Sequence, residues 1–141
     1  ESKKDKFKKK FKKDGKYLAD NLQEGLPAIS LSSQMSLYTA IGNDVNQNMI
    51  FAQQVYVYGN KNDTLLGIST SGNSSNVINA IMVAKVLGLT VVGLTGDKGG
   101  KMNKYCDYII EAPGNNSSEI QELHLPIYHT ICKILEEELF V

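Results

Sequence analysis

The chain has 141 residues, of which 42% are hydrophobic and 21% charged, and its formal net charge is zero at pH 7. This length suits one domain with a moderate core. No apolar run is long enough to span a membrane and no signal peptide opens the sequence, so we expect no membrane partner. The two cysteines, Cys106 and Cys132, form no Cys-x-x-Cys motif and are expected to be reduced, which favours a cytoplasmic location.

The charge is unevenly distributed. Residues 1–16 contain nine lysines and three acidic residues, whereas the rest of the chain is net acidic. Phe7 and Phe11 are four residues apart, so a helix would place both rings on one face. Contact with a nucleic acid or a membrane surface is one interpretation. We favour a solvated insertion helix whose rings dock on the domain, because the remaining chain is acidic, and nucleic acid is not an expected partner. We assign residues 1–25 to this extension and residues 26–141 to the folded domain.

The other elements follow in chain order. Residues 26–31 predict a short strand opened by Pro27, and residues 32–41 a turn with one or two helical turns. Residues 50–58 carry a helical apolar stripe. Residues 65–68 predict a buried strand, and the apolar spacing from Asn76 predicts a helix to Leu87. Two more strands are predicted at residues 90–95 and 108–111, and a long closing helix at residues 118–140. This alternation predicts an α/β fold, a doubly wound parallel sheet of flavodoxin-like αβα type.

The segment between the strand at 65–68 and the following helix is rich in hydroxyl groups. It reads Ser69-Thr70-Ser71-Gly72-Asn73-Ser74, and we call residues 69–74 the hydroxyl loop. A strand that turns through such a loop into a helix start presents unpaired N–H groups and a favourable helix dipole to an anion. A simple helix N-cap is the alternative, since Ser and Asn cap helices in any case. The density of donors favours a phosphate site.

No nucleotide cofactor is predicted. The sequence has no Gly-x-Gly-x-x-Gly after a strand, and Gly100-Lys101 lacks the other residues of a P-loop. All fifteen basic residues are lysines, so no arginine fork can clamp a phosphate, which leaves hydroxyls and backbone N–H groups as its ligands.

The closing helix carries the remaining candidate chemistry. Gln121 and His129 are eight residues apart, or about 80° on the helical wheel, so one helical face can present both. His124 lies about 60° to the other side of Gln121. A single histidine on a helix is more often packed or solvated than catalytic, but the polarity of this face favours a role for His129.

Three stretches together resemble the phosphoheptose isomerases of the sugar isomerase (SIS) domain superfamily. They are Leu-Leu-Gly-Ile-Ser-Thr-Ser-Gly-Asn-Ser, Leu-Thr-Gly-Asp-Lys-Gly-Gly-Lys-Met and Ile-Gln-Glu-Leu-His. The resemblance covers about residues 26–139. It implies an aldose–ketose isomerase that interconverts sedoheptulose 7-phosphate and a D-glycero-heptose 7-phosphate for activated-heptose and surface-glycan biosynthesis, and it suggests a homotetramer with sites shared between subunits.

The resemblance also implies roles for particular residues. The substrate phosphate would be held by Ser69, Thr70, Ser71 and Ser74. Asn43 and Asp44 match an Asn-Asp pair near the sugar. Gln121 matches a substrate-contacting residue and His129 the catalytic acid/base, and both would be zinc ligands in members that bind zinc. Proton transfer through an enediol needs such a base and a group that polarises the carbonyl.

Part of the family pattern has no counterpart in this chain. Missing are the first strand, its Gly-Asn-Gly-Gly-Ser loop, and the helix with a further His and the presumed catalytic Glu. The chain also begins at Glu1, so we expect either an upstream extension or another segment to complete the sheet. The competing function is a non-catalytic SIS module, either a phosphosugar sensor or an adaptor of the type that binds the replication initiator. The presence of Ser71 and His129 favours an enzyme.

Overall fold

The computed structural model describes residues 2–140, which divide into two compact units. One unit contains the chain up to residue 28 together with residues from 136 onward, and the other contains residues 29–135. Each unit has its own internal contacts, and the candidate site residues all lie in the second one.

The lysine-rich segment forms helix α1 (Lys3–Asn21). Its start is a capping box, in which the Ser2 hydroxyl accepts from the Asp5 N–H at 3.1 Å and the Asp5 carboxylate accepts from the Ser2 N–H at 3.2 Å. At Lys12 the backbone leaves helical geometry, with φ 49° and ψ −115°. The Ser2 side chain is the main cause of a lowered pKa of Asp5.

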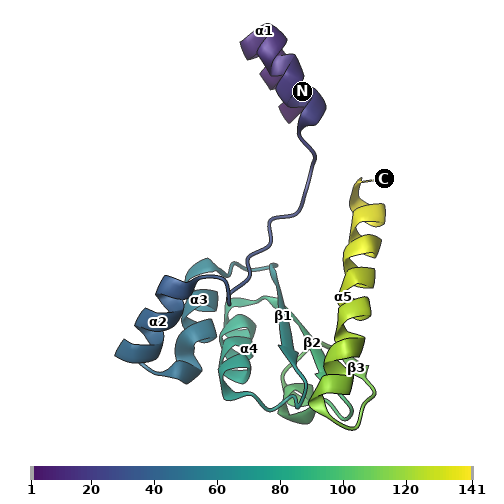
Figure 1. Ribbon diagram of the computed structural model, residues 1–141. Helices are drawn as coiled ribbons and strands as arrows, with labels where there is room; N and C mark the ends of the chain where they lie inside the picture. The colour runs from purple at the N-terminus through teal and green to yellow at the C-terminus, as the bar shows by residue number, and fades with distance from the viewer. Residues whose placement is uncertain (1, 141) are drawn as a thin grey trace. The chain divides into compact units, whose positions relative to one another are not determined.

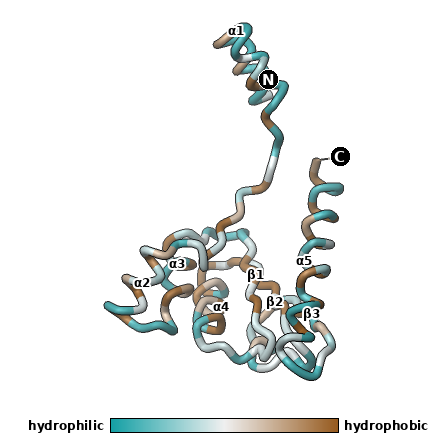
Figure 2. The backbone as a smooth tube through the Cα atoms, viewed as in Figure 1, coloured by the Kyte–Doolittle hydropathy of each residue, from teal (hydrophilic) through white to brown (hydrophobic). Residues whose placement is uncertain are grey.

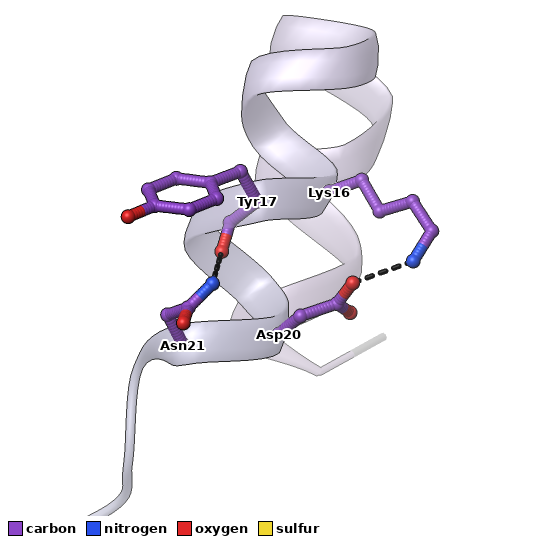
Figure 3. A network of polar contacts seen from close by, with 4 residues as sticks. All are labelled: Lys16, Tyr17, Asp20 and Asn21. Carbon is purple, nitrogen blue, oxygen red and sulfur yellow. Dashed lines mark hydrogen bonds and ion pairs between the residues drawn. The ribbon is translucent and has the colours of Figure 1, made fainter.

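The last turns of α1 are held by contacts along the helix (Figure 3). Lys16 forms an ion pair with Asp20 four residues later, and the Asn21 side-chain amide donates to the Tyr17 carbonyl at 2.7 Å. These groups are solvent-exposed, so the two contacts add little to stability.

Three parallel strands form the sheet in the order β1-β2-β3 (Figure 1). They are β1 (Thr64–Ser69), β2 (Thr90–Gly96) and β3 (Tyr108–Ala112). Ser69 is level with Thr95 in the first pair of strands, and Thr95 is level with Glu111 in the second. The predicted parallel α/β architecture is therefore confirmed, and the polar ends of β1 and β2 lie at the same edge of the sheet.

One face of the sheet is covered by α4 (Ser75–Leu87), which packs in turn against α3 (Ile50–Tyr58). A Cβ on Gly67 of β1 would meet Val77 and Ile81 of α4 at 3.2 and 3.4 Å. Apolar residues of α4, α3 and β2 form the buried core cluster, and Figure 2 shows the hydrophobic colours concentrated in the strands and α4. Burial of these side chains, at about 25 cal/mol per Å², is the main force that holds this layer.

The other face carries the first half of α5 (Ser117–Phe140). Gly96 points away from the α4 side, because its position in β2 has the opposite parity to that of Gly93, which is level with Gly67. A Cβ on Gly96 would lie 2.4 Å from the Cδ1 atom of Ile120, so only glycine admits this close approach of α5. Helices therefore lie on both faces, as a doubly wound sheet requires (Figure 1).

Shorter elements connect these layers. Helix α2 (Met35–Asp44) is followed by the 3₁₀ turn η1 (Gln47–Met49), and a second 3₁₀ turn, η2 (Gly100–Lys104), follows β2. The Asn79 side chain of α4 donates to the Asn48 carbonyl of η1 at 3.0 Å. This bond ties the α2–α3 connection to the same helix that follows the hydroxyl loop.

The strand predicted at residues 26–31 is wrong. The segment has no regular secondary structure, and the side chains of Leu26 and Ile29 are each 55% exposed. A strand persists only where a neighbour pairs with its backbone, and the described sheet contains only β1, β2 and β3. Instead, the buried Gln54 side chain of α3 donates to the Leu31 carbonyl at 3.0 Å, which holds the end of this segment as a loop.

Among the described residues, no helix is both long enough and apolar enough to cross a membrane.

Candidate active site

The hydroxyl loop begins at the carboxyl end of β1 and ends at the N-cap of α4. Ser69 is buried at 7% exposure, and its hydroxyl shares a hydrogen bond of 2.9 Å with that of Ser74. Ser74 is the N-cap residue of α4, yet its side chain makes no capping bond among the described residues. The helix-cap interpretation of this serine is thus not supported. In the first turn of α4 the Val77 N–H donates to the Asn76 side-chain oxygen at 2.9 Å, and the N–H groups of Ser75 and Asn76 remain available to an anion.

The loop folds tightly because of Gly72. The Gly72 N–H donates to the Ser69 carbonyl at 3.0 Å, and its φ of +61° is in the region that favours glycine. A Cβ at this position would lie 2.0 Å from the carbonyl oxygen of Gly99. Ser71 reinforces the turn, because its hydroxyl accepts from the Asn73 N–H at 3.2 Å. The loop is therefore preformed by its own backbone and by the segment beside it.

The segment that follows β2 braces the loop from the side. The Lys101 N–H donates to the Asn73 side-chain oxygen at 3.0 Å, and the Met102 N–H donates to the Gly72 carbonyl at 3.0 Å. We did not predict this brace. A signal for it was present in the pair Gly99-Gly100, whose positive φ values of 59° and 56° allow the backbone to approach the loop.

Thr70, the second residue of the hydroxyl loop, connects the loop to both β2 and α5. Its carbonyl accepts from the Gly96 N–H at 2.9 Å, and its hydroxyl lies 3.4 Å from that of Ser117. The loop is consequently attached to the first turn of the closing helix as well as to the strand beside it.

Asn43 and Asp44 lie at the last turn of α2 and are exposed. Within residues 2–140, no hydrogen bond or ion pair joins either side chain to the hydroxyl loop. Their predicted role near the sugar stays a prediction.

On α5, Gln121 and His129 are both exposed, and the His129 ring lies against the Tyr128 ring with centroids 5.0 Å apart. About 12 Å of helix rise separates the two backbone positions. His124 differs from both, because it is 4% exposed and its Nε2 atom lies 3.0 Å from the Thr95 carbonyl oxygen. Gln121 and His129 are thus accessible to a ligand, whereas His124 is directed into the protein.

A hollow of about 430 Å³ lies beside the first turns of α4. Two lysines contribute to it, and its lining consists of Ser75, Ile78, Asn79, Met82, Lys101, Lys104 and Tyr105. The cationic side chains on this side add positive potential near the start of α4, where the helix dipole already favours an anion.

The pKa shifts of the second unit arise at the opposite edge of the sheet. Lys85 and the Val91 N–H bind the Asp107 carboxylate and lower its pKa, and burial together with Asp107 raises the pKa of Cys106. The Val91 N–H lies 2.8 Å from the Asp107 oxygen at the start of β2. The contacts that cause these pKa shifts attach the start of β2 to the start of β3, and they do not involve the hydroxyl loop.

The described residues offer few donor atoms for the zinc ion expected from the sequence. No group of three or more His, Cys, Asp or Glu side chains that could hold a metal occurs within the described part. Gln121 and His129 supply two donors at most, whereas a catalytic zinc usually has three protein ligands. The residues described here do not by themselves fit a zinc site.

Comparisons with known proteins show the family of this chain. A family model described as an SIS domain matches residues 18–96, which is more than half of the chain. The chain belongs to the SIS domain family. The matched region includes the hydroxyl loop, α4 and β2, and ends before α5, so Gln121 and His129 lie outside it.

Individual relatives of this SIS domain are phosphoheptose isomerases, and the predicted resemblance is confirmed. The protein from Aliarcobacter butzleri is 49% identical over 125 residues, which is 89% of this chain and 65% of that protein. The one from Burkholderia pseudomallei strain 1710b is 45% identical over 116 residues, covering 82% and 59%. A solved phosphoheptose isomerase from Francisella tularensis superposes with a TM-score of 0.79 at 38% identity, covering 82% and 62%. The chain therefore spans about three fifths of the length of these relatives.

Proposed function

We propose that the protein is an aldose–ketose isomerase that interconverts sedoheptulose 7-phosphate and a D-glycero-heptose 7-phosphate, in the supply of activated heptoses for surface glycans. The single observation that carries the proposal is the state of the hydroxyl loop. Ser69 and Ser74 bind each other, so the Ser74 hydroxyl does not cap α4, and the N–H groups of Ser75 and Asn76 are left without a side-chain acceptor among the described residues. A preformed loop of neutral donors at a helix start suits a phosphate monoester that must bind and then leave.

In this proposal the hydroxyl loop binds the phosphate, and His129 of α5 acts on the reacting carbons at the other end of the sugar. Ser69, Thr70, Ser71 and Ser74 donate hydroxyl hydrogen bonds to the phosphate oxygens, and Asn43 and Asp44 approach the sugar hydroxyls. His129 removes a proton from C1 of the ketose, and the C2 carbonyl oxygen takes up a proton to give an enediol. A proton is then returned at C2 while the C1 hydroxyl loses its proton, which forms the C1 carbonyl of the aldose. The reaction needs no external oxidant or reductant, because the two carbons exchange oxidation states.

Support for this assignment comes from two directions. A relative named phosphoheptose isomerase is 49% identical to this chain over 125 residues. Independently, α5 is attached to the loop through Thr70 and Ser117, so the helix that carries Gln121 and His129 starts beside the proposed phosphate site.

We also propose a zinc ion for the intact site, bound by Gln121, His129 and at least one ligand from outside residues 2–140 or from another copy of the chain. When bound, zinc would polarise the sugar carbonyl. A crystal structure of the full-length protein, with anomalous data at the zinc edge, tests this ligand set. A metal held by Gln121 and His129 together with other residues of 2–140 alone would contradict it.

Two further properties belong to the proposal. We infer a homotetramer, supported by exposed apolar side chains on α5, among them Leu123, Leu125, Ile134 and Leu135. We also infer a cytoplasmic location, supported by the free thiols of Cys106 and Cys132. Light scattering of the purified protein tests the first inference, and fractionation of the source cells tests the second.

One observation favours a second candidate, a non-catalytic phosphosugar sensor or adaptor. Among the described residues, the His129 ring lies against Tyr128, and no hydrogen bond to a carboxylate orients it for proton transfer. Such a module would bind the sugar phosphate through the same loop but would not interconvert it.

The experiment that separates the two candidates is an assay of the full-length protein with sedoheptulose 7-phosphate, with and without added zinc. Conversion to the aldose in either condition supports the isomerase. Binding of the sugar phosphate in a calorimetric titration, with no conversion in either condition, supports the sensor or adaptor. Absence of binding would reject both.

A further inference from the structure

The buried histidine of α5 has no part in the function proposed so far. The Nε2 atom of His124 lies 3.0 Å from the Thr95 carbonyl oxygen, and the side chain is 4% exposed. A carbonyl can only accept, so Nε2 carries the proton in this bond. The bond joins a residue of α5 to one that is 29 positions earlier in the chain.

Thr95 lies beside the hydroxyl loop, near the carboxyl end of β2, and makes contacts on both faces of the sheet. It is level with Ser69 on the neighbouring strand, so the two side chains point to the same face, which is the α4 side. Its carbonyl accepts from His124, which belongs to α5 on the other face. Thr95 is fully buried, and its hydroxyl has no hydrogen-bond partner among the described residues.

Two neighbouring contacts attach the same part of α5. Ile120, one turn before His124, packs on Gly96, where no Cβ could fit, and Ser117 at the start of the helix lies near the Thr70 hydroxyl. Both contacts permit some rotation of the helix about its axis, because one is apolar and the other is 3.4 Å long and exposed. The His124 bond is buried and directional, so it sets the rotation.

The rotation of α5 at His124 determines where its exposed polar residues lie. Gln121 precedes His124 by three residues and His129 follows it by five, which is about 4.5 Å and about 7.5 Å of helix rise. We propose that His124 is a positioning residue, which fixes α5 on the end of β2 so that His129 meets the reacting carbons of a sugar whose phosphate is in the hydroxyl loop. This inference rests on the proposed function, since it assigns His129 the proton transfer.

Three variants of the full-length protein test the proposal. In His124→Gln, the amide nitrogen reaches the position of Nε2 and can donate to Thr95. In His124→Asn, the amide is too short to do so, which makes it the matched polar control. His124→Leu removes the donor. Misplacement of a reacting group by about 1 Å can cost about 100-fold in rate, so we expect kcat to fall between about 10-fold and about 100-fold in the Asn and Leu variants.

The Gln variant should keep kcat within about threefold of wild type, and KM should stay within about threefold in all variants, because the phosphate loop is intact. Equal kcat values for the Gln and Asn variants would overturn the proposal, as would a wild-type kcat in the Leu variant. If the Leu variant does not fold, the Gln and Asn pair decides alone.

A second readout separates this inference from the proposed isomerase activity. The imidazole ¹⁵N signals of His129 are recorded before and after addition of sedoheptulose 7-phosphate. A shift in wild type and the Gln variant that is lost in the Asn variant supports positioning, even if wild-type protein shows no turnover and the isomerase proposal fails. A shift of equal size in the Asn variant, or no shift in wild type, overturns the positioning role.

Discussion

The hydroxyl oxygens of Ser69 and Ser74 lie 2.9 Å apart, across the mouth of the turn that joins β1 to α4. Each hydroxyl therefore uses the other as a partner when no ligand is bound, and neither is left unsatisfied in a half-buried position. A phosphate would replace this neutral bond with two charge-assisted ones, which are about twice as strong. The hydrogen bond between Ser69 and Ser74 thus holds the two ends of the loop together, and both hydroxyls can still donate to an anion.

Loss of loop hydroxyls should weaken binding of the sugar phosphate. We expect the double variant Ser69→Ala and Ser71→Ala to bind sedoheptulose 7-phosphate less tightly by about 1.5–3 kcal/mol for each lost charge-assisted bond. Calorimetric titration measures the change. Ser36→Ala is the control, because Ser36 is an exposed residue of α2 and is not part of the hydroxyl loop. Unchanged affinity in the double variant would reject the phosphate assignment.

The turn at Gly72 should tolerate no side chain. In Gly72→Ala the new Cβ would be placed 2.0 Å from the Gly99 carbonyl oxygen, at a φ of +61°, so the loop must shift. We expect a loss of about 1–3 kcal/mol in the free energy of unfolding, together with weaker phosphate binding. Gly25→Ala is the matched control, since a Cβ there meets nothing within 4 Å. Equal urea midpoints for the two variants would contradict the turn geometry.

Replacement of the exposed histidine should separate chemistry from binding. His129→Asn cannot carry the proton between the two sugar carbons, so turnover should fall by at least about 100-fold, the lower end for an acid/base group. Phosphate affinity should persist, because the hydroxyl loop is formed without contribution from His129. The assay is conversion of sedoheptulose 7-phosphate, with and without zinc. A variant that retains wild-type turnover would remove His129 from the mechanism.

The Asp107 carboxylate should make stability depend on acid pH. Its bonds to Lys85 and the Val91 N–H lower its pKa in the folded state, so its stabilising contribution is complete above the usual Asp pKa of about 4 and is lost as pH falls through the lower folded value. Asp107→Asn should therefore be less stable than wild type at pH 7, and the difference should shrink at about pH 3. Urea unfolding at both pH values measures it. A difference that persists undiminished in acid would show that the pair has no linkage to folding.

The sequence alone was sufficient for most of the elements in the second unit. The strand at 65–68, the helix from Asn76 and the strand at 90–95 were predicted within two residues of β1, α4 and β2. Apolar periodicity decides these elements, because the faces they bury repeat every two or every 3.6 residues. The position of the hydroxyl loop followed from them, since a loop after a parallel strand must lie at the carboxyl edge of the sheet.

Tertiary structure decided what periodicity does not encode. Residues 26–31 have the composition of a strand but form none, because strand formation depends on a partner that the described sheet does not supply. Serine is a common helix N-cap, but the Ser74 hydroxyl is hydrogen-bonded to that of Ser69, five residues earlier. His124 and His129 are five residues apart on one helix, yet one is buried against Thr95 and the other is exposed. Only the packing of α5 on β2 distinguishes them, because a side chain's environment depends on neighbours that are distant in the sequence.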